Sequence, residues 1–211
     1  MEPEPSYSPD PEVCVGQVAV DASAVYIPVN ECFLDATLRV DRYDLATGVV
    51  ETLLPDLVGS HQLRLNATLE ADGWLYLASW SIERFDPLTG LQELLPVVED
   101  HSDQFGALYP TSRLAYGPDG LLYVLEAIDE VVRYDPSDWS KVDTFVEPGA
   151  GGVVLATDLA FSSRYGLLLL LEGNKNEVLQ YDATTGAYLR NFEVDGEVNA
   201  TGRMIVAACE P

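Results

Sequence analysis

The sequence predicts an all-β fold made of four similar units, each containing four short strands. A pair formed by an aromatic residue and an aspartate recurs four times, with the aromatic residue at positions 43, 85, 134 and 181. A strongly apolar segment precedes each pair. No segment combines the 3.6-residue periodicity and the capping residues that are typical of a helix. The aromatic residues are 42, 49 and 47 positions apart. A repeat of this length indicates one repeating architecture rather than several unrelated domains.

Each aromatic–aspartate pair is expected to open a turn between two strands. The aspartate can accept hydrogen bonds from backbone N–H groups of the turn, and a glycine that follows it supplies a positive φ. The four copies are Tyr43-Asp44 with Gly48, Phe85-Asp86 with Gly90, Tyr134-Asp135 with Trp139, and Tyr181-Asp182 with Gly186. Because the third copy has a tryptophan where the others have glycine, its turn is expected to differ.

The segments before these turns are hairpins with an apolar second strand. Runs such as WLYLA and LLYVL have no polar alternation, which is typical of strands covered on both faces. The hairpins span residues 17–30, 68–79, 114–126 and 159–172, and the last strands of the units span 49–54, 91–95, 141–146 and 187–192. Four-stranded units that must stack on their neighbours predict the blades of a β-propeller.

The predicted propeller is one domain over residues 13–211, preceded by an acidic, proline-rich tail or linker over residues 1–12. Four four-stranded blades account for most of it. Residues 203–208 resemble the beginning of the third blade and predict a fifth, lone inner strand near the C-terminus. Either four blades close and this strand is an accessory, or its missing neighbours come from another chain.

The LYV-type strands and YD-x-x-TG turns resemble the NHL and YVTN-type repeats. They are also similar to the gluconolactonase-like and streptogramin-lyase-like propellers, over roughly residues 15–208. The resemblance implies a propeller fold. Since families with unrelated activities share these features, it implies much less about function.

The charge of the chain excludes some partners. Eleven basic and 35 acidic residues give a formal net charge of −24, which repels the phosphate backbone of nucleic acids. No apolar run approaches the roughly 20 residues that a membrane-spanning helix needs. The acidity fits a secreted or periplasmic protein, adaptation to high salt, or cation binding. We expect an extracytoplasmic location, although no export signal is visible after Met1.

Polar residues occupy one equivalent position at the ends of the apolar strands. Aligning these strands places Asn30, Ser79, Glu126 and Glu172 just before the following loop, on the expected ligand face. Such oxygen ligands suit calcium or magnesium, with Glu126 and Glu172 as the metal candidates. In the gluconolactonase-like family, Glu, Asn and Asp side chains at this mouth hold a divalent ion, and the resemblance implies a partly similar set. The alternative is that strand ends simply favour polar residues.

Two further candidates lie on the same expected face. His101, flanked by carboxylates, could act as a general base, a role that the resemblance to streptogramin-lyase-like enzymes also implies, or it could simply be solvated. Trp80, at a turn, could stack on a sugar. Packing inside or between blades is the expected role of Trp74 and Trp139.

The three cysteines allow at most one internal disulfide. A hairpin that turns at Ala22-Ser23 would place Cys14 opposite Cys32, which predicts a Cys14–Cys32 disulfide and leaves Cys209 as a free thiol. The alternative is a reduced cytosolic protein with three free thiols.

Two functions remain open at this point. The first is a non-enzymatic extracytoplasmic propeller that binds a ligand or a protein, or self-associates, through the edge of strand 203–208. The alternative is a hydrolase or lyase that depends on a divalent metal and uses Glu126, Glu172 and His101.

Overall fold

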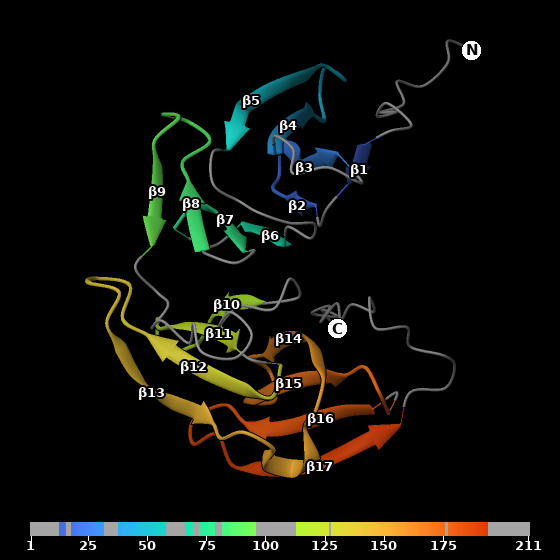
Figure 1. Ribbon diagram of the computed structural model, residues 1–211, viewed down its shortest axis with the longest axis vertical. Helices are drawn as coiled ribbons and strands as arrows, with labels where there is room; N and C mark the ends of the chain where they lie inside the picture. The colour runs from blue at the N-terminus through green and yellow to red at the C-terminus, as the bar shows by residue number, and fades with distance from the viewer. Residues whose placement is uncertain are drawn as a thin grey trace. The chain divides into compact units, whose positions relative to one another are not determined.

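The computed structural model confirms the all-β fold class (Figure 1). It describes residues 13–15, 18–31, 38–57, 66–69, 72–78, 82–95, 113–126, 128–175 and 177–193. By their internal contacts, residues 1–95 and 96–211 form two compact units, and each is described by itself.

Each unit contains two antiparallel sheets whose strands follow the order of the chain. The strands of the first unit are β1 (Val13–Val15), β2 (Ala19–Val20), β3 (Ala24–Glu31), β4 (Leu38–Asp44), β5 (Val50–Leu57), β6 (Asn66–Leu69), β7 (Leu75–Ala78), β8 (Ile82–Phe85) and β9 (Gln92–Leu95). Blade 1 consists of β1–β5 and blade 2 of β6–β9.

The second unit repeats this arrangement. Its strands are β10 (Leu114–Tyr116), β11 (Leu122–Glu126), β12 (Glu130–Tyr134), β13 (Lys141–Val146), β14 (Ala156–Ser162), β15 (Leu167–Glu172), β16 (Glu177–Asp182) and β17 (Tyr188–Glu193). Blade 3 is β10–β13 and blade 4 is β14–β17. A single 3₁₀ turn, Ala150–Gly152, joins β13 to β14. Four blades of four strand positions confirm the predicted β-propeller fold.

In blade 1, two short strands share the first position. Both β1 and β2 pair with β3, and the register changes by one residue between them. The hairpin turns at Ala22-Ser23 as predicted, because the Asp21 N–H donates to the Ala24 carbonyl at 3.0 Å. If the register of β2 and β3 continued, Cys14 would lie opposite Glu31, and the register change places it opposite Asn30 instead. Neither register places Cys14 opposite position 32, as the prediction requires. Cys32 lies outside the described residues, so the disulfide stays a prediction.

The core of each unit lies between its two sheets. Apolar strands such as β11, buried along its whole length, supply it because both faces of the sheet are covered. In the first unit the cluster is Ala19, Ala24, Tyr26, Val40, Leu75, Leu77 and Phe85. In the second unit it includes Tyr123, Leu125, Val131, Phe145, Leu159, Leu168, Leu170, Leu179 and Tyr181.

Some predicted segments fall outside the described residues. These are the tail 1–12, strand 203–208 and Cys209. Within the described residues no α-helix occurs, and no helix is long and apolar enough to cross a membrane.

Candidate functional site

The four aspartate turns have one geometry. In each, the aspartate backbone N–H donates to the residue five positions on, and the N–H of the fifth turn residue donates back to the aspartate carbonyl. The aspartate side chain also accepts backbone N–H groups, such as that of Thr47 on Asp44 at 2.8 Å. These bonds, first those from Thr47 to Asp44, hold the pKa of the carboxyl below its usual range. The predicted role of the aspartates is therefore confirmed.

The expectation that the third turn differs is wrong. Trp139 adopts φ 62°, close to the φ of 69° at Gly48, and its N–H donates to the Asp135 carbonyl at 2.7 Å. The Ser140 N–H also donates to Asp138, which stands where the other turns have threonine. The hydrogen bonds of the turn therefore outweigh the cost of a left-handed tryptophan, about 1–2 kcal/mol.

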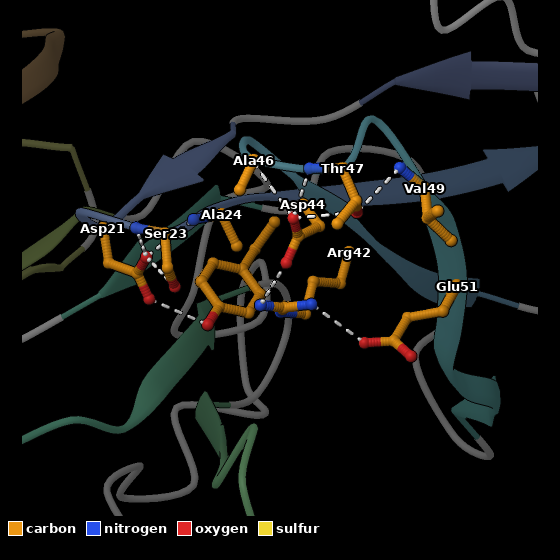
Figure 2. A network of polar contacts seen from close by, with 10 residues as sticks. Asp21, Ser23, Ala24, Arg42, Asp44, Ala46, Thr47, Val49 and Glu51 are labelled. Atoms are coloured by element: carbon orange, nitrogen blue, oxygen red, sulfur yellow. Dashed lines mark hydrogen bonds and ion pairs between the residues drawn. The ribbon is translucent and has the colours of Figure 1, made fainter.

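Each of three blades contains a row of polar side chains that runs across its own strands, and the sequence analysis missed these rows. In blade 1, Tyr26 lies opposite Arg42, and Arg42 lies opposite Glu51 on the outer strand. The Tyr26 hydroxyl donates to Asp21 at 2.9 Å, and Arg42 Nη1 donates to Glu51 at 3.1 Å. Figure 2 shows this row together with the aspartate turn of the same blade.

Blades 2 and 3 repeat the row at the same strand positions. The members are Asp72, Tyr76, Arg84 and Glu93 in blade 2. They are Asp119, Tyr123, Arg133 and Asp143 in blade 3. The signal that could have revealed them is an Asp-x-x-x-Tyr motif in two blades and an arginine nine or ten residues before an acid on the outer strand.

In blade 3, the pKa shifts of the row residues follow from their burial and from their bonds to one another. Burial, and after it the bond to Asp119, raise the pKa of Tyr123 to about 12, although the bond to Arg133 opposes them. Asp143 raises the pKa of Arg133, and Arg133 in turn lowers the pKa of Asp143. Arg133 is therefore a cation and Tyr123 a neutral phenol near neutral pH, and their bonds link the first turn, the third strand and the outer strand of blade 3.

Blade 4 departs from this pattern. The equivalent positions are Leu169, Gln180 and Arg190, so the arginine lies on the outer strand instead of the third strand. Arg190 Nε donates to the Gln180 amide oxygen at 3.0 Å. The outer strand of blade 4 thus carries a cation where those of the other blades carry a carboxylate.

Two of the predicted ligand-face residues are buried and bonded within the protein. Glu126 and Glu172 end β11 and β15, as aligned from the sequence. The Tyr134 hydroxyl donates to Glu126 at 2.5 Å. Glu172, fully buried, accepts the N–H groups of Val154 at 2.8 Å and Leu155 at 3.0 Å. These bonds attach the loop before β14 to blade 4.

Of the four remaining ligand-face candidates, the structure describes only Asn30. Asn30 lies in β3 with its backbone opposite Cys14, and Ser79, Trp80 and His101 lie outside the described residues. Among the described residues, no group of three or more His, Cys, Asp or Glu side chains could hold a metal ion. Trp74 packs under the Arg84 guanidinium, whose carbon lies 4.2 Å from the ring centroid.

Among the described residues, the outer strand of blade 4 exposes more large apolar side chains than the outer strands of the other blades. Three large side chains of β17 remain exposed, Tyr188 at 40%, Leu189 at 50% and Phe192 at 46%. In the described part of the chain β17 has one strand neighbour, β16, and so ends its sheet. Exposed apolar strands at a sheet edge favour pairing with another chain.

Comparisons with known proteins support the fold. No family model matches the chain, and no curated protein matches it. Among solved structures, a protein of unknown function from Bacteroides caccae is similar with a TM-score of 0.61 and 13% identity over 90% of this chain and 65% of that one. A chain of a mitotic checkpoint complex is similar with a TM-score of 0.59 and 19% identity, over 90% of this chain and 54% of that one. A chain of a nidogen/laminin complex is similar with a TM-score of 0.60 and 12% identity, over 90% of this chain and 83% of that one. At these identities the likeness concerns the fold alone.

Proposed function

We propose that this chain is a non-enzymatic, extracytoplasmic β-propeller module that binds or assembles proteins. The observation that carries the proposal is the exposed apolar edge of blade 4, where Leu189 and Phe192 lie on a strand that ends its sheet. When a partner strand covers such an edge, the burial of its apolar side chains lowers the free energy of the complex.

Two further observations support a binding role. The solved structures with a similar fold include chains taken from a mitotic checkpoint complex and a nidogen/laminin complex. The carboxylates of Glu126 and Glu172, on which the metal-dependent hydrolase or lyase would depend, already accept hydrogen bonds inside blades 3 and 4. Glu172 accepts backbone N–H groups at both carboxylate oxygens, so a cation bound there would compete with these donors.

Thermal unfolding during calcium and magnesium titration tests the proposal against the enzyme alternative. A cation held by the folded chain raises the Tm by mass action. We expect no saturable rise with either ion, in the wild type or in Glu126→Gln. A saturable rise in the wild type that Glu126→Gln abolishes would favour the metal-dependent alternative and contradict the proposal.

A further inference from the structure

Within each unit, the first strand of the second blade lies against the two innermost strands of the first blade. In the first unit β6 contacts β2 and β3, and in the second unit β14 contacts β10 and β11. Leu159 and Phe161 of β14 belong to the core that blades 3 and 4 share. The strand that follows a blade in the chain thus covers the innermost strands of that blade.

An ion pair joins the first strands of blades 3 and 4. Arg113 directly precedes β10, and its Nε lies 3.3 Å from Oδ1 of Asp158 in β14. The two side chains are only 11% and 10% exposed. Both residues hold the same position in their blades, since each is followed by leucine, alanine and an aromatic residue. Equivalent positions of consecutive blades therefore meet at this ion pair.

The C-terminal segment repeats this spacing once more. Arg203 follows Asp158 by the same 45 residues by which Asp158 follows Arg113. A carboxylate has two oxygens and can accept bonds from more than one guanidinium group. An arginine at the equivalent position of a next strand therefore has the charge and the place to pair with Asp158.

The apolar residues after Arg203 also have equivalents in β14. At the same offset Met204 corresponds to Leu159, and Val206 corresponds to Phe161. Both of these β14 side chains pack in the core with blade 3. We therefore expect Met204 and Val206 to be the side chains that face the preceding blade.

The face of blade 4 that lies away from blade 3 can accept such a strand. Leu168 and Leu170 of β15 belong to the core shared with blade 3, and side chains alternate between the two faces along a strand. The opposite face of β15 carries three further leucines, which are Leu167, Leu169 and Leu171. This face thus offers an apolar surface to Met204 and Val206.

The sizes of the facing side chains change together. The Phe161 ring meets the Tyr123 ring of blade 3 with their centroids 4.8 Å apart. Leu169 takes the place of this tyrosine in blade 4, because it pairs with Gln180 as Tyr123 pairs with Arg133. Val206 takes the place of the phenylalanine in the C-terminal segment. A smaller pair thus replaces a larger one at the same position between consecutive strands.

We propose that residues 203–206 lie against β14 and β15 as the first strand of a fifth blade position, with Arg203 paired to Asp158. The occupant of this face of blade 4 is then a segment of the same chain. The inference goes beyond the proposed function, because these contacts hold whether or not β17 binds a partner.

A double-mutant cycle in the full chain, followed by chemical denaturation, tests the ion pair. Asp158 is buried, so Arg203→Met is expected to raise the equilibrium constant for unfolding about tenfold. In the Asp158→Asn background the same change is expected to have a much smaller effect. Arg190→Met, a matched change on β17, is expected to have equal effects in both backgrounds.

Two acid substitutions test the orientation of the segment. Val206→Asp would place a carboxylate against the leucines of β15 and is expected to raise the unfolding constant about tenfold or more. Ile205→Asp is the matched control, because alternation turns residue 205 away from blade 4. It is expected to change the unfolding constant about twofold or less.

Three results would overturn the inference. One is an equal effect of Arg203→Met in the two backgrounds. Another is a loss of stability from Ile205→Asp as large as that from Val206→Asp. The third is a coupling that grows with protein concentration, because the segment on blade 4 would then belong to a second copy. None of these involves β17 or calcium, so failure of this inference is distinguishable from failure of the proposed function.

Discussion

Arg133 and Asp143 are joined by a two-point ion pair across β12 and β13. The Nε–Oδ1 distance is 2.7 Å and the Nη2–Oδ2 distance is 2.5 Å. The same guanidinium contacts Asp119 at 3.0 Å, and its carbon lies 4.7 Å from the Phe145 ring centroid. One arginine therefore links the first turn, the third strand and the outer strand of blade 3.

Removing this arginine should destabilise the chain. Charged hydrogen bonds with two-point geometry contribute more than single surface pairs, so Arg133→Met is expected to cost about 2 kcal/mol of unfolding free energy. Chemical denaturation of Arg133→Met, Asp143→Asn and the double variant measures the coupling between the two side chains. A coupling energy near zero would mean that the pair is only a solvated surface contact.

Two glycines at the same turn position are predicted to tolerate alanine unequally. Gly90 and Gly186 have φ of 76° and 71°, but an added Cβ would meet open space at Gly90 and the Phe145 carbonyl oxygen at Gly186. Gly90→Ala should cost about 1 kcal/mol from backbone strain alone. Gly186→Ala should cost at least about 2–3 kcal/mol, because the turn must also move away from β13. Equal losses in denaturation experiments would show that the close approach is absent.

The aspartate turns predict a particular response to acid. Hydrogen bonds, first those from Thr47, lower the pKa of Asp44 in the folded state, so the unfolded chain binds its proton first as pH falls. The stability that Asp44 contributes is complete above the unfolded pKa near 4 and is lost as pH falls through the lowered folded pKa. The Tm difference between the wild type and Asp44→Asn should therefore shrink below about pH 4. A difference that is constant down to strongly acidic pH would contradict this linkage.

Much of the architecture was predictable because the turns have a recognisable sequence pattern. An aspartate that accepts turn amides and a glycine with positive φ leave a local pattern, and Gly48, Gly90 and Gly186 follow it. Trp139 shows the limit of that reasoning, since the bonds around Asp135 impose a conformation that tryptophan disfavours when isolated. The register change between β1 and β2 likewise has no local signal.

The candidate site was less predictable than the fold. The alignment placed Glu126 and Glu172 correctly at strand ends, but the donors that surround them come from residues distant in sequence, such as Val154 for Glu172. The exchange of positions that puts Arg190 on β17 becomes visible only once the strand register aligns it with Glu51, Glu93 and Asp143.

The cysteines test the compartment. Non-reducing peptide mapping of the wild type is expected to yield a Cys14–Cys32 bridge and a free Cys209. In the described register Cys14 lies opposite Asn30, and Cys32 lies outside the described residues, so the mapping itself decides the pairing. Three free thiols would contradict the extracytoplasmic location, and a bridge from Cys14 to Cys209 would contradict the hairpin register.

Hydrogen–deuterium exchange of the wild-type chain at low and high concentration tests the central claim, an assembly module that pairs through blade 4, most directly. If the chain assembles through β17, amides of Tyr188–Glu193 exchange more slowly at high concentration, whereas those of the outer strand Gln92–Leu95 do not change. Exchange of Tyr188–Glu193 that is independent of concentration would contradict the account.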